Sequence, residues 1–161
     1  MTTDIIQAFA PTGTLRASLN VGNPVLANLD AAGNPFGISI DLAHALGQRL
    51  GVPVDLIVND TAGKSVATVE AGKADIGFFA IDPVRGQGIA FTSAYVQIEG
   101  SYLVRQNSPL QKNEDVDKPM HRIVVGKGSA YDLYLTREVK AATLERAPTS
   151  PAVVDFFMEH R

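Results

Sequence analysis

The stretch VPVDLIVNDTAGKSVATVEAGKADIGFFAI, residues 52–81, decides the fold of this chain. It opens on an apolar run of strand length, continues as a helical pattern that ends at Gly72, and closes on a second apolar run. We expect strands at 52–58 and 75–81 and a helix at 63–70 between them. A strand, a helix and a strand in succession are typical of an α/β fold whose strands run parallel.

The same alternation extends toward the N-terminus. A strand is expected at 15–21 and a helix at 39–50, which Ser39 or Asp41 can cap and which Gly51 ends. The expected apolar face of this helix comprises Leu42, Ala43, Leu46 and Leu50. The first half therefore reads as strand-helix-strand-helix-strand, which predicts a parallel sheet with helices on both faces.

The rest of the chain restarts this pattern. Two extended segments, 89–95 and 96–105, precede a polar stretch that we take as a lobe boundary, giving a first lobe with crossing strands at 1–105 and a partial second lobe at 106–161. The second lobe is expected to contain a strand at 122–126, a helix capped by Ser129, a strand at 143–147 and a helix from Ser150. No strand follows the last helix, so we expect the chain to end inside its second lobe; a lobe that ends on a terminal helix is the alternative.

Composition excludes several classes of function. The 161 residues include 14 Lys and Arg against 17 Asp and Glu, a formal net charge of −3, which argues against a nucleic-acid partner. The absence of cysteine excludes disulfides, thiolate zinc sites and cysteine nucleophiles. The three histidines show no metal-ligand spacing, and no serine lies in a nucleophile elbow. We therefore expect no metal, no other cofactor and no catalytic residue.

No apolar stretch is long enough to span a bilayer. Residues 1–10 have no basic region and include Asp4, so they do not have the pattern of a signal peptide. The sequence as written predicts either a cytoplasmic protein or a chain that begins after a cleaved leader.

Two glycine-containing turns precede helices. The turn at 62–65 lacks the first glycine of a phosphate loop, because Val58 stands there, and is expected to be an ordinary helix start. The turn at 126–129 contains two glycines before a helix, where backbone amides and the helix dipole favour an anion. A plain strand-to-helix turn is the alternative for the second.

Arg85 follows the strand expected at 75–81. In an open parallel sheet the ligand crevice lies at the carboxyl ends of the strands, and a guanidinium there suits two-point capture of a carboxylate. A surface arginine in a capped turn is the alternative.

Six short pieces, in order along the chain, together resemble the extracytoplasmic solute-binding proteins that bind polar amino acids for ABC transporters. They are the residues at 33–42, LGV at 50–52, EAGKAD at 70–75, IDPVR at 81–85, IAFTSAY at 89–95 and IVVGKGS at 123–129. The resemblance covers about 12–161 and implies two α/β lobes that close on a ligand at a hinge.

The resemblance also implies ligand-binding residues. Arg85 matches the arginine that clamps the ligand α-carboxylate. The other matched positions are Phe78 and Ala80, where backbone groups meet the ligand, Asn20 and Asn23 on the first loop, and Ser129 and Ala130 at the start of the second-lobe helix. The acidic residue that holds the ligand ammonium is expected beyond Arg161.

The chain departs from the family pattern at Asp82, Val84 and Ala80. The resemblance therefore still implies the carboxylate clamp, but it does not imply which ligand side chain is preferred. The implied function is that of a non-enzymatic, periplasmic solute-binding component whose partners are a small carboxylate ligand and an ABC transporter permease. An enzyme similar to cyclohexadienyl dehydratase and a ligand-sensing domain are the alternatives. An incomplete second lobe would also leave a sheet edge open to self-association.

Overall fold

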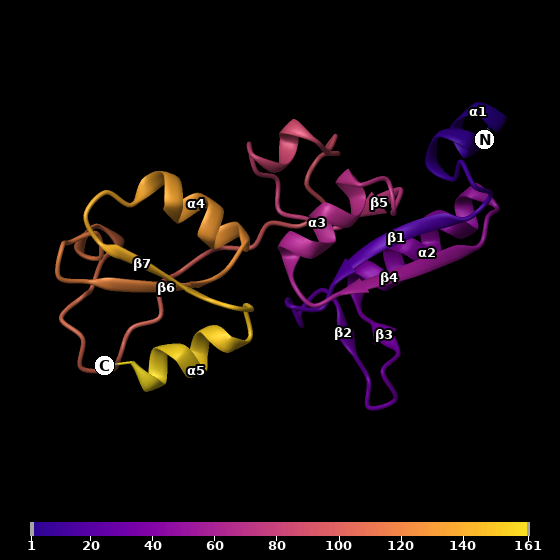
Figure 1. Cartoon of the computed structure of the whole chain (residues 1–161). Helices are drawn as coiled ribbons and strands as arrows, with labels where there is room; N and C mark the ends of the chain where they lie inside the picture. Colours follow the sequence, from indigo (N-terminus) through magenta and orange to yellow (C-terminus); the bar gives the residue numbers. More distant parts are fainter. Residues whose placement is uncertain (1, 161) are drawn as a thin grey trace. The chain divides into compact units, whose positions relative to one another are not determined.

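The computed structural model describes residues 2–160. They form two compact units, which meet in the sequence between Ile89 and Ala90. Each unit is described by itself. Figure 1 labels the helices and strands of both. The lobe boundary predicted after residue 105 stays a prediction. In the described part of the chain, no helix is both long and apolar enough to cross a membrane.

The first unit alternates strands and helices as the sequence predicts. Its elements are α1 (Thr3–Phe9), β1 (Leu15–Asn20), β2 (Asn28–Leu29), β3 (Pro35–Phe36), α2 (Ile38–Leu50), β4 (Val54–Asn59), α3 (Ala62–Glu70), β5 (Ile76–Gly77) and the short 3-10 turn η1 (Arg85–Gln87). The strands predicted at 15–21 and 52–58 and the helices predicted at 39–50 and 63–70 are thereby confirmed to within two residues.

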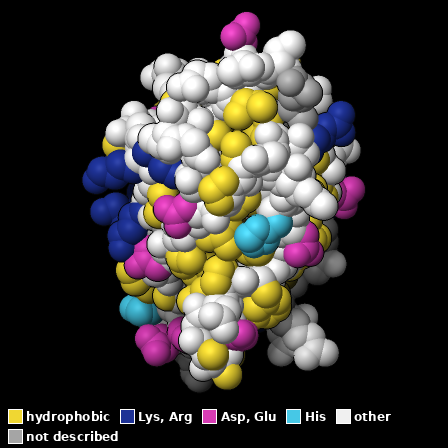
Figure 2. Space-filling model, turned by 90° about the vertical axis from the view of Figure 1, so that its right-hand side faces the viewer, with side chains coloured by type: hydrophobic (Ala, Val, Ile, Leu, Met, Phe, Trp, Pro, Cys, Tyr) yellow, Lys and Arg dark blue, Asp and Glu magenta, His cyan; other side chains and the backbone are white. Residues whose placement is uncertain are grey.

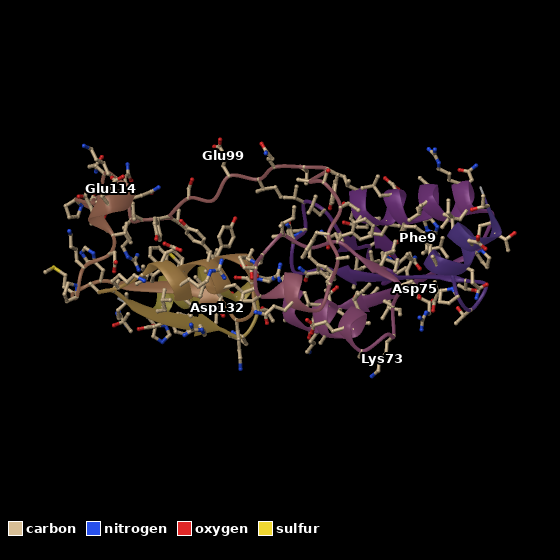
Figure 3. All side chains as sticks on the ribbon, turned by 90° about the horizontal axis from the view of Figure 1, so that it is seen from above. Phe9, Lys73, Asp75, Glu99, Glu114 and Asp132 are labelled. Atoms are coloured by element: carbon tan, nitrogen blue, oxygen red, sulfur yellow. The ribbon has the colours of Figure 1, made fainter. Side chains whose placement is uncertain are left out.

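The sheet of the first unit is parallel and has the order β4-β1-β5. β1 pairs with β4 along its whole length, from Leu15 opposite Val54 to Asn20 opposite Asn59. Helices α2 and α3 lie on opposite faces of this sheet (Figures 1 and 3). Because β1 is covered on both faces, Leu15 and Leu19 are completely buried.

The second unit repeats the arrangement on a smaller scale. It contains η2 (Asn113–Asp115), β6 (Arg122–Gly126), α4 (Ala130–Glu138), β7 (Thr143–Ala147) and α5 (Ala152–Glu159). β6 and β7 pair in parallel over five positions, with α4 and α5 on opposite sides of the pair (Figure 1). The core comprises Val116, Ile123, Val125 and Leu135. The two strands predicted here, 122–126 and 143–147, are confirmed residue for residue.

Several expectations about local structure differ from the structure. The strand predicted at 75–81 is hydrogen-bonded only at β5, and the segments predicted to be extended at 89–95 and 96–105 form no strand, because no strand of the described chain pairs with them. The structure also contains the antiparallel hairpin β2–β3, between the strand predicted at 15–21 and the helix predicted at 39–50. Neither Ser39 nor Asp41 caps α2, whose N-cap is Gly37. On the face of α2, Ile40 is buried and Leu42 is 40% exposed.

A buried polar network ties α3 to the sheet. The Ser18 hydroxyl on β1 donates to the Ser65 carbonyl oxygen at 3.0 Å and lies 2.7 Å from the Ser65 hydroxyl. The Asn59 amide nitrogen donates to the Ser18 hydroxyl at 3.1 Å, and the Thr68 hydroxyl donates to the Asn59 amide oxygen at 3.2 Å. When the Ser18 hydroxyl donates to the Ser65 carbonyl oxygen, the Ser65 hydroxyl donates to the Ser18 oxygen. The Ser18 hydroxyl then both donates and accepts hydrogen bonds.

Ser18→Ala is expected to lower the free energy of unfolding by about 1–3 kcal/mol, because it leaves buried partners without a hydrogen bond. Chemical denaturation measures the change. Thr12→Ala, which removes an exposed hydroxyl from the same unit, serves as the control and is expected to stay within about 0.5 kcal/mol of the parent. Equal effects of the two substitutions would contradict the role given to the network.

An ion pair joins β1 to the residue before β5. Asp75 accepts hydrogen bonds from the Arg16 backbone nitrogen at 2.9 Å and from the guanidinium at 3.1 Å and 2.6 Å, and its own backbone nitrogen donates to the Arg16 carbonyl. Burial alone would raise the pKa of the Asp75 carboxyl, but the hydrogen bonds from Arg16 outweigh that effect and lower the pKa below its ordinary value.

The sign of the resulting pH dependence follows from this lowered pKa. The stability contributed by ionised Asp75 is complete well above its unfolded pKa of about 3.9 and is lost as the pH falls through the folded pKa. Asp75→Asn is therefore expected to be less stable than the parent at neutral pH, with the difference shrinking below about pH 4. Denaturation at a series of pH values measures this, with Asp41→Asn on α2 as the control for removing an exposed carboxylate from the same unit. A difference that stays constant down to pH 2 would contradict the assignment.

Candidate functional site

The three strands of the sheet β4-β1-β5 end at one edge of that sheet, because they run parallel. Asn20 is the last residue of β1 and lies opposite Asn59, the last residue of β4. Phe78 directly follows β5, and Ala80 comes two residues later. The structure thus brings Asn20, Phe78 and Ala80 to the edge where open parallel sheets bind ligands.

Arg85 lies in a tight turn that follows this edge. The Asp82 carbonyl accepts from the Gly86 amide at 2.9 Å, and the Asp82 carboxylate accepts from the Val84 amide at 2.9 Å. Arg85 is 5% exposed and Asp82 is 6% exposed. The Arg85 guanidinium donates to the Ala80 carbonyl oxygen at 3.2 Å. The turn therefore fixes the guanidinium against the chain that leaves β5, and does not leave it as a surface side chain.

The positive charge of Arg85 is buried and lies within reach of the negative charge of Asp82. Burial lowers the pKa of its guanidinium, and the negative charge of Asp82 acts in the opposite direction. Because arginine stays protonated in proteins, its buried positive charge has lost much of its hydration. An anionic group that reaches Arg85 would replace that hydration with a charge-assisted hydrogen bond.

The first loop is shaped by its own asparagines. The Asn20 side-chain oxygen accepts from the Gly22 amide at 3.0 Å, and the Asn23 side-chain oxygen accepts from the Val25 amide at 3.3 Å. A Cβ atom at Gly22 would lie 2.9 Å from the Asn20 side-chain oxygen and 3.1 Å from the Asp60 carbonyl oxygen. Glycine at this position therefore lets the loops that follow β1 and β4 approach closely.

Ser129 and Ala130 lie in the second unit, at the turn between β6 and α4. Ser129 is the N-cap of α4, and its hydroxyl accepts from the Asp132 backbone nitrogen at 3.2 Å, which confirms the predicted cap. Ala130 opens the helix, where an amide has no acceptor within the helix. These two residues belong to the second compact unit, whereas Arg85 belongs to the first.

The turn at 126–129 differs from the simple anion site that its glycines suggest. The Gly128 amide already donates to the protein's own Asp132 carboxylate at 2.9 Å. The turn at 62–65 is the helix start that the sequence predicts: Thr61 caps α3 by accepting from the Lys64 amide, and the Lys64 ammonium pairs with Asp60 at 2.8 Å.

Sequence reasoning missed Asn59 and Asp132 as organising residues. Asn59 ends β4 as Asn20 ends β1, and its position after an apolar strand was the available signal. Asp132 stands three residues after Ser129, the spacing of a capping box. That pattern could have been read from the sequence.

A comparison with family models identifies the chain. Residues 15–145 match the model of bacterial extracellular solute-binding proteins, family 3, a span that includes nearly all the strands and helices just described. The chain belongs to this family. A comparison with curated protein sequences finds no match.

Solved structures share the fold. An ancestral amino acid-binding protein, a precursor of cyclohexadienyl dehydratase, superposes with a TM-score of 0.82 at 22% identity, over 98% of this chain and 70% of that one. An amino acid ABC transporter substrate-binding protein from Streptococcus pneumoniae, bound to L-arginine, gives 0.80 at 20% identity, over 96% and 67%. A putative ABC transporter binding component from Wolinella succinogenes, complexed with lysine, gives 0.71 at 23% identity, over 89% and 63%.

At these identities the likeness establishes the fold: a periplasmic-binding-protein-like α/β architecture of parallel sheets flanked by helices. The chain spans between 63% and 70% of the length of these three solved structures.

Proposed function

We propose that this protein binds an amino acid or a similar small carboxylate as the solute-binding component of an ABC-type transporter. The observation that carries the proposal is the buried Arg85 in the turn after β5, in a chain that belongs to a solute-binding family. Two of the proteins that share its fold hold lysine and L-arginine, each with an α-carboxylate, which supports this class of ligand.

In the proposed complex the Arg85 guanidinium binds the ligand carboxylate. Its planar fork of donors matches the two oxygens of a carboxylate, and the bond to the Ala80 carbonyl holds the fork in one orientation. Backbone groups of Phe78 and Ala80 and the side chains of Asn20 and Asn23 add hydrogen bonds from the first unit. Ser129 and the Ala130 amide contact the ligand from the second unit. The boundary between the two lobes is proposed to follow residue 105.

The proposed protein partner is the permease of the transporter. We also propose a periplasmic location, with a cytoplasmic one as the alternative. Exposed apolar residues of the first unit offer surface for a protein partner; they include Val25, Phe36 and Ile38, at 73%, 51% and 48% exposure. Figure 2 shows, on the face it presents, a band of hydrophobic side chains with lysine and arginine gathered along one side. Self-association is the alternative use of exposed apolar surface.

We propose that the protein is not an enzyme. A dehydratase is the alternative, because one of the proteins that share the fold is an amino acid-binding precursor of cyclohexadienyl dehydratase. An assay with prephenate and arogenate separates the two, because a binding protein leaves both compounds unchanged while a dehydratase consumes one of them.

Arg85→Ala is expected to weaken ligand binding by about 2–5 kcal/mol, or roughly 30-fold or more, because the ligand carboxylate loses its charged partner. Arg85→Lys keeps the positive charge but loses the planar fork of guanidinium donors. Its affinity for the ligand is expected to lie between those of the alanine variant and the parent. Calorimetry with lysine, arginine and a panel of other amino acids and small carboxylates measures the dissociation constants.

The matched control is Arg49→Ala, which removes an exposed arginine from α2 of the same unit. Circular dichroism verifies that each variant is folded at the temperature of the titration. A folded Arg85→Ala variant that binds as tightly as the parent would refute the proposed clamp. Failure of the parent to bind any compound of the panel would refute the proposed ligand class.

A further inference from the structure

We propose that Asp132 is a positioning residue for the ligand: its buried carboxylate fixes the turn that carries Ser129 and Ala130. This inference rests on the proposed function, because it assigns a role to a residue behind the proposed ligand contacts. Asp132 is 6% exposed and lies on the first turn of α4. Figure 3 labels it among the side chains of the second unit.

Three hydrogen-bond donors converge on the Asp132 carboxylate. The Gly128 amide donates to Oδ2 at 2.9 Å, while the Arg146 guanidinium Nε donates to Oδ1 at 2.8 Å and the Thr136 hydroxyl donates to Oδ1 at 3.1 Å. The Arg146 guanidinium also donates to the Thr136 hydroxyl at 2.8 Å. The carboxylate therefore connects the turn before α4, the middle of α4 and strand β7.

The turn needs this support because its backbone is unusual. Gly128 has φ +71°, the left-handed region that side chains rarely adopt, and the Ser129 amide donates back to the Gly126 carbonyl at 3.0 Å. On its other side the turn is confined by the loop between β7 and α5, since a Cβ atom at Gly126 would lie 2.8 Å from the Ser150 Cα atom. With Gly128 tied to Asp132, the direction of the Ala130 amide is set before any ligand arrives.

The donors also explain why the residue is an aspartate. All three neighbours present hydrogens to it, so both of its side-chain oxygens must accept. An asparagine of the same shape has one oxygen and one NH2 group, and that group would face either the Gly128 amide or the Arg146 guanidinium. Asp132→Asn thus removes a hydrogen bond without creating a cavity, which makes it a sharp test of positioning.

Asp117 supplies a matched control in the same unit. Its carboxylate accepts from three backbone amides, at 2.9 Å from Lys140, 2.8 Å from Ala141 and 2.8 Å from Ala142. These amides lie between the end of α4 and the start of β7, at the opposite end of α4 from Ser129. Asp117→Asn therefore disturbs a comparable set of bonds to the backbone without touching the turn at 126–130.

The experiment measures ligand affinity by calorimetry on the whole chain, using whichever amino acid of the panel the parent binds, at a temperature where circular dichroism shows every variant folded. Asp132→Asn is expected to raise the dissociation constant about tenfold, because a displaced contact weakens binding even in a folded protein. Asp117→Asn is expected to leave the dissociation constant within about twofold, while both variants lower the melting temperature. Amide hydrogen exchange at Gly128, followed by NMR, is expected to accelerate only in Asp132→Asn.

The outcomes separate this inference from the function on which it rests. If the parent binds an amino acid and folded Asp132→Asn binds it equally well, the positioning role is refuted and the proposed function stands. If Asp117→Asn weakens binding as much as Asp132→Asn, the effect is one of general stability and the positioning role is again refuted. If the parent binds nothing in the panel, both fail.

Should Asp132→Asn not fold, Thr136→Val replaces it. Thr136 is exposed, and its hydroxyl bridges the Asp132 carboxylate and the Arg146 guanidinium, so its removal loosens the cluster without burying an unpaired charge. A dissociation constant two- to fivefold above that of the parent, by a rough estimate, supports the role, and an unchanged one refutes it.

Discussion

The pairing of β1 with a parallel neighbour on each side is the constraint on which the first unit depends. β1 is hydrogen-bonded to β4 along its whole length and to β5 at Ala17 and Ser18. Parallel pairing forces the carboxyl ends of the strands to one edge, and it requires a crossover on each side, which α2 and α3 provide. The position of Phe78 and Ala80 beside the loop that follows Asn20 is therefore a consequence of hydrogen bonding in the sheet.

Buried polar groups refine this scaffold in the same way in both units. Ser18 and Asn59 tie α3 to the first sheet, and Asp132 with Arg146 ties α4 to β7 in the second. In each case a side chain near the start of a helix, or facing it, is joined to a strand by buried or part-buried hydrogen bonds. The helix starts are thus fixed relative to the strand ends, where the proposed ligand contacts lie.

The sequence predicts this scaffold well where periodicity is strong. The strands at 122–126 and 143–147 and the Ser129 cap follow from local patterns, and the structure reproduces them. The segments at 89–105 were predicted to be extended from composition alone, yet a strand also needs a partner, which local sequence does not supply. The burial of Arg85 and the convergence of donors on Asp132 likewise depend on residues distant in sequence, so patterns alone could not reveal them. The roles of Arg85, Phe78, Ala80, Asn20, Asn23, Ser129 and Ala130 remain predictions.

The central claim is that this protein recognises the carboxylate of its ligand. The most direct measurement compares amino acids with the amines that lack only that group, by calorimetry on the parent chain: arginine with agmatine, and lysine with cadaverine. We expect that at least one amino acid binds and that its decarboxylated partner binds at least about 30-fold more weakly, a difference of roughly 2 kcal/mol. Equal affinity for an amino acid and its amine would contradict it.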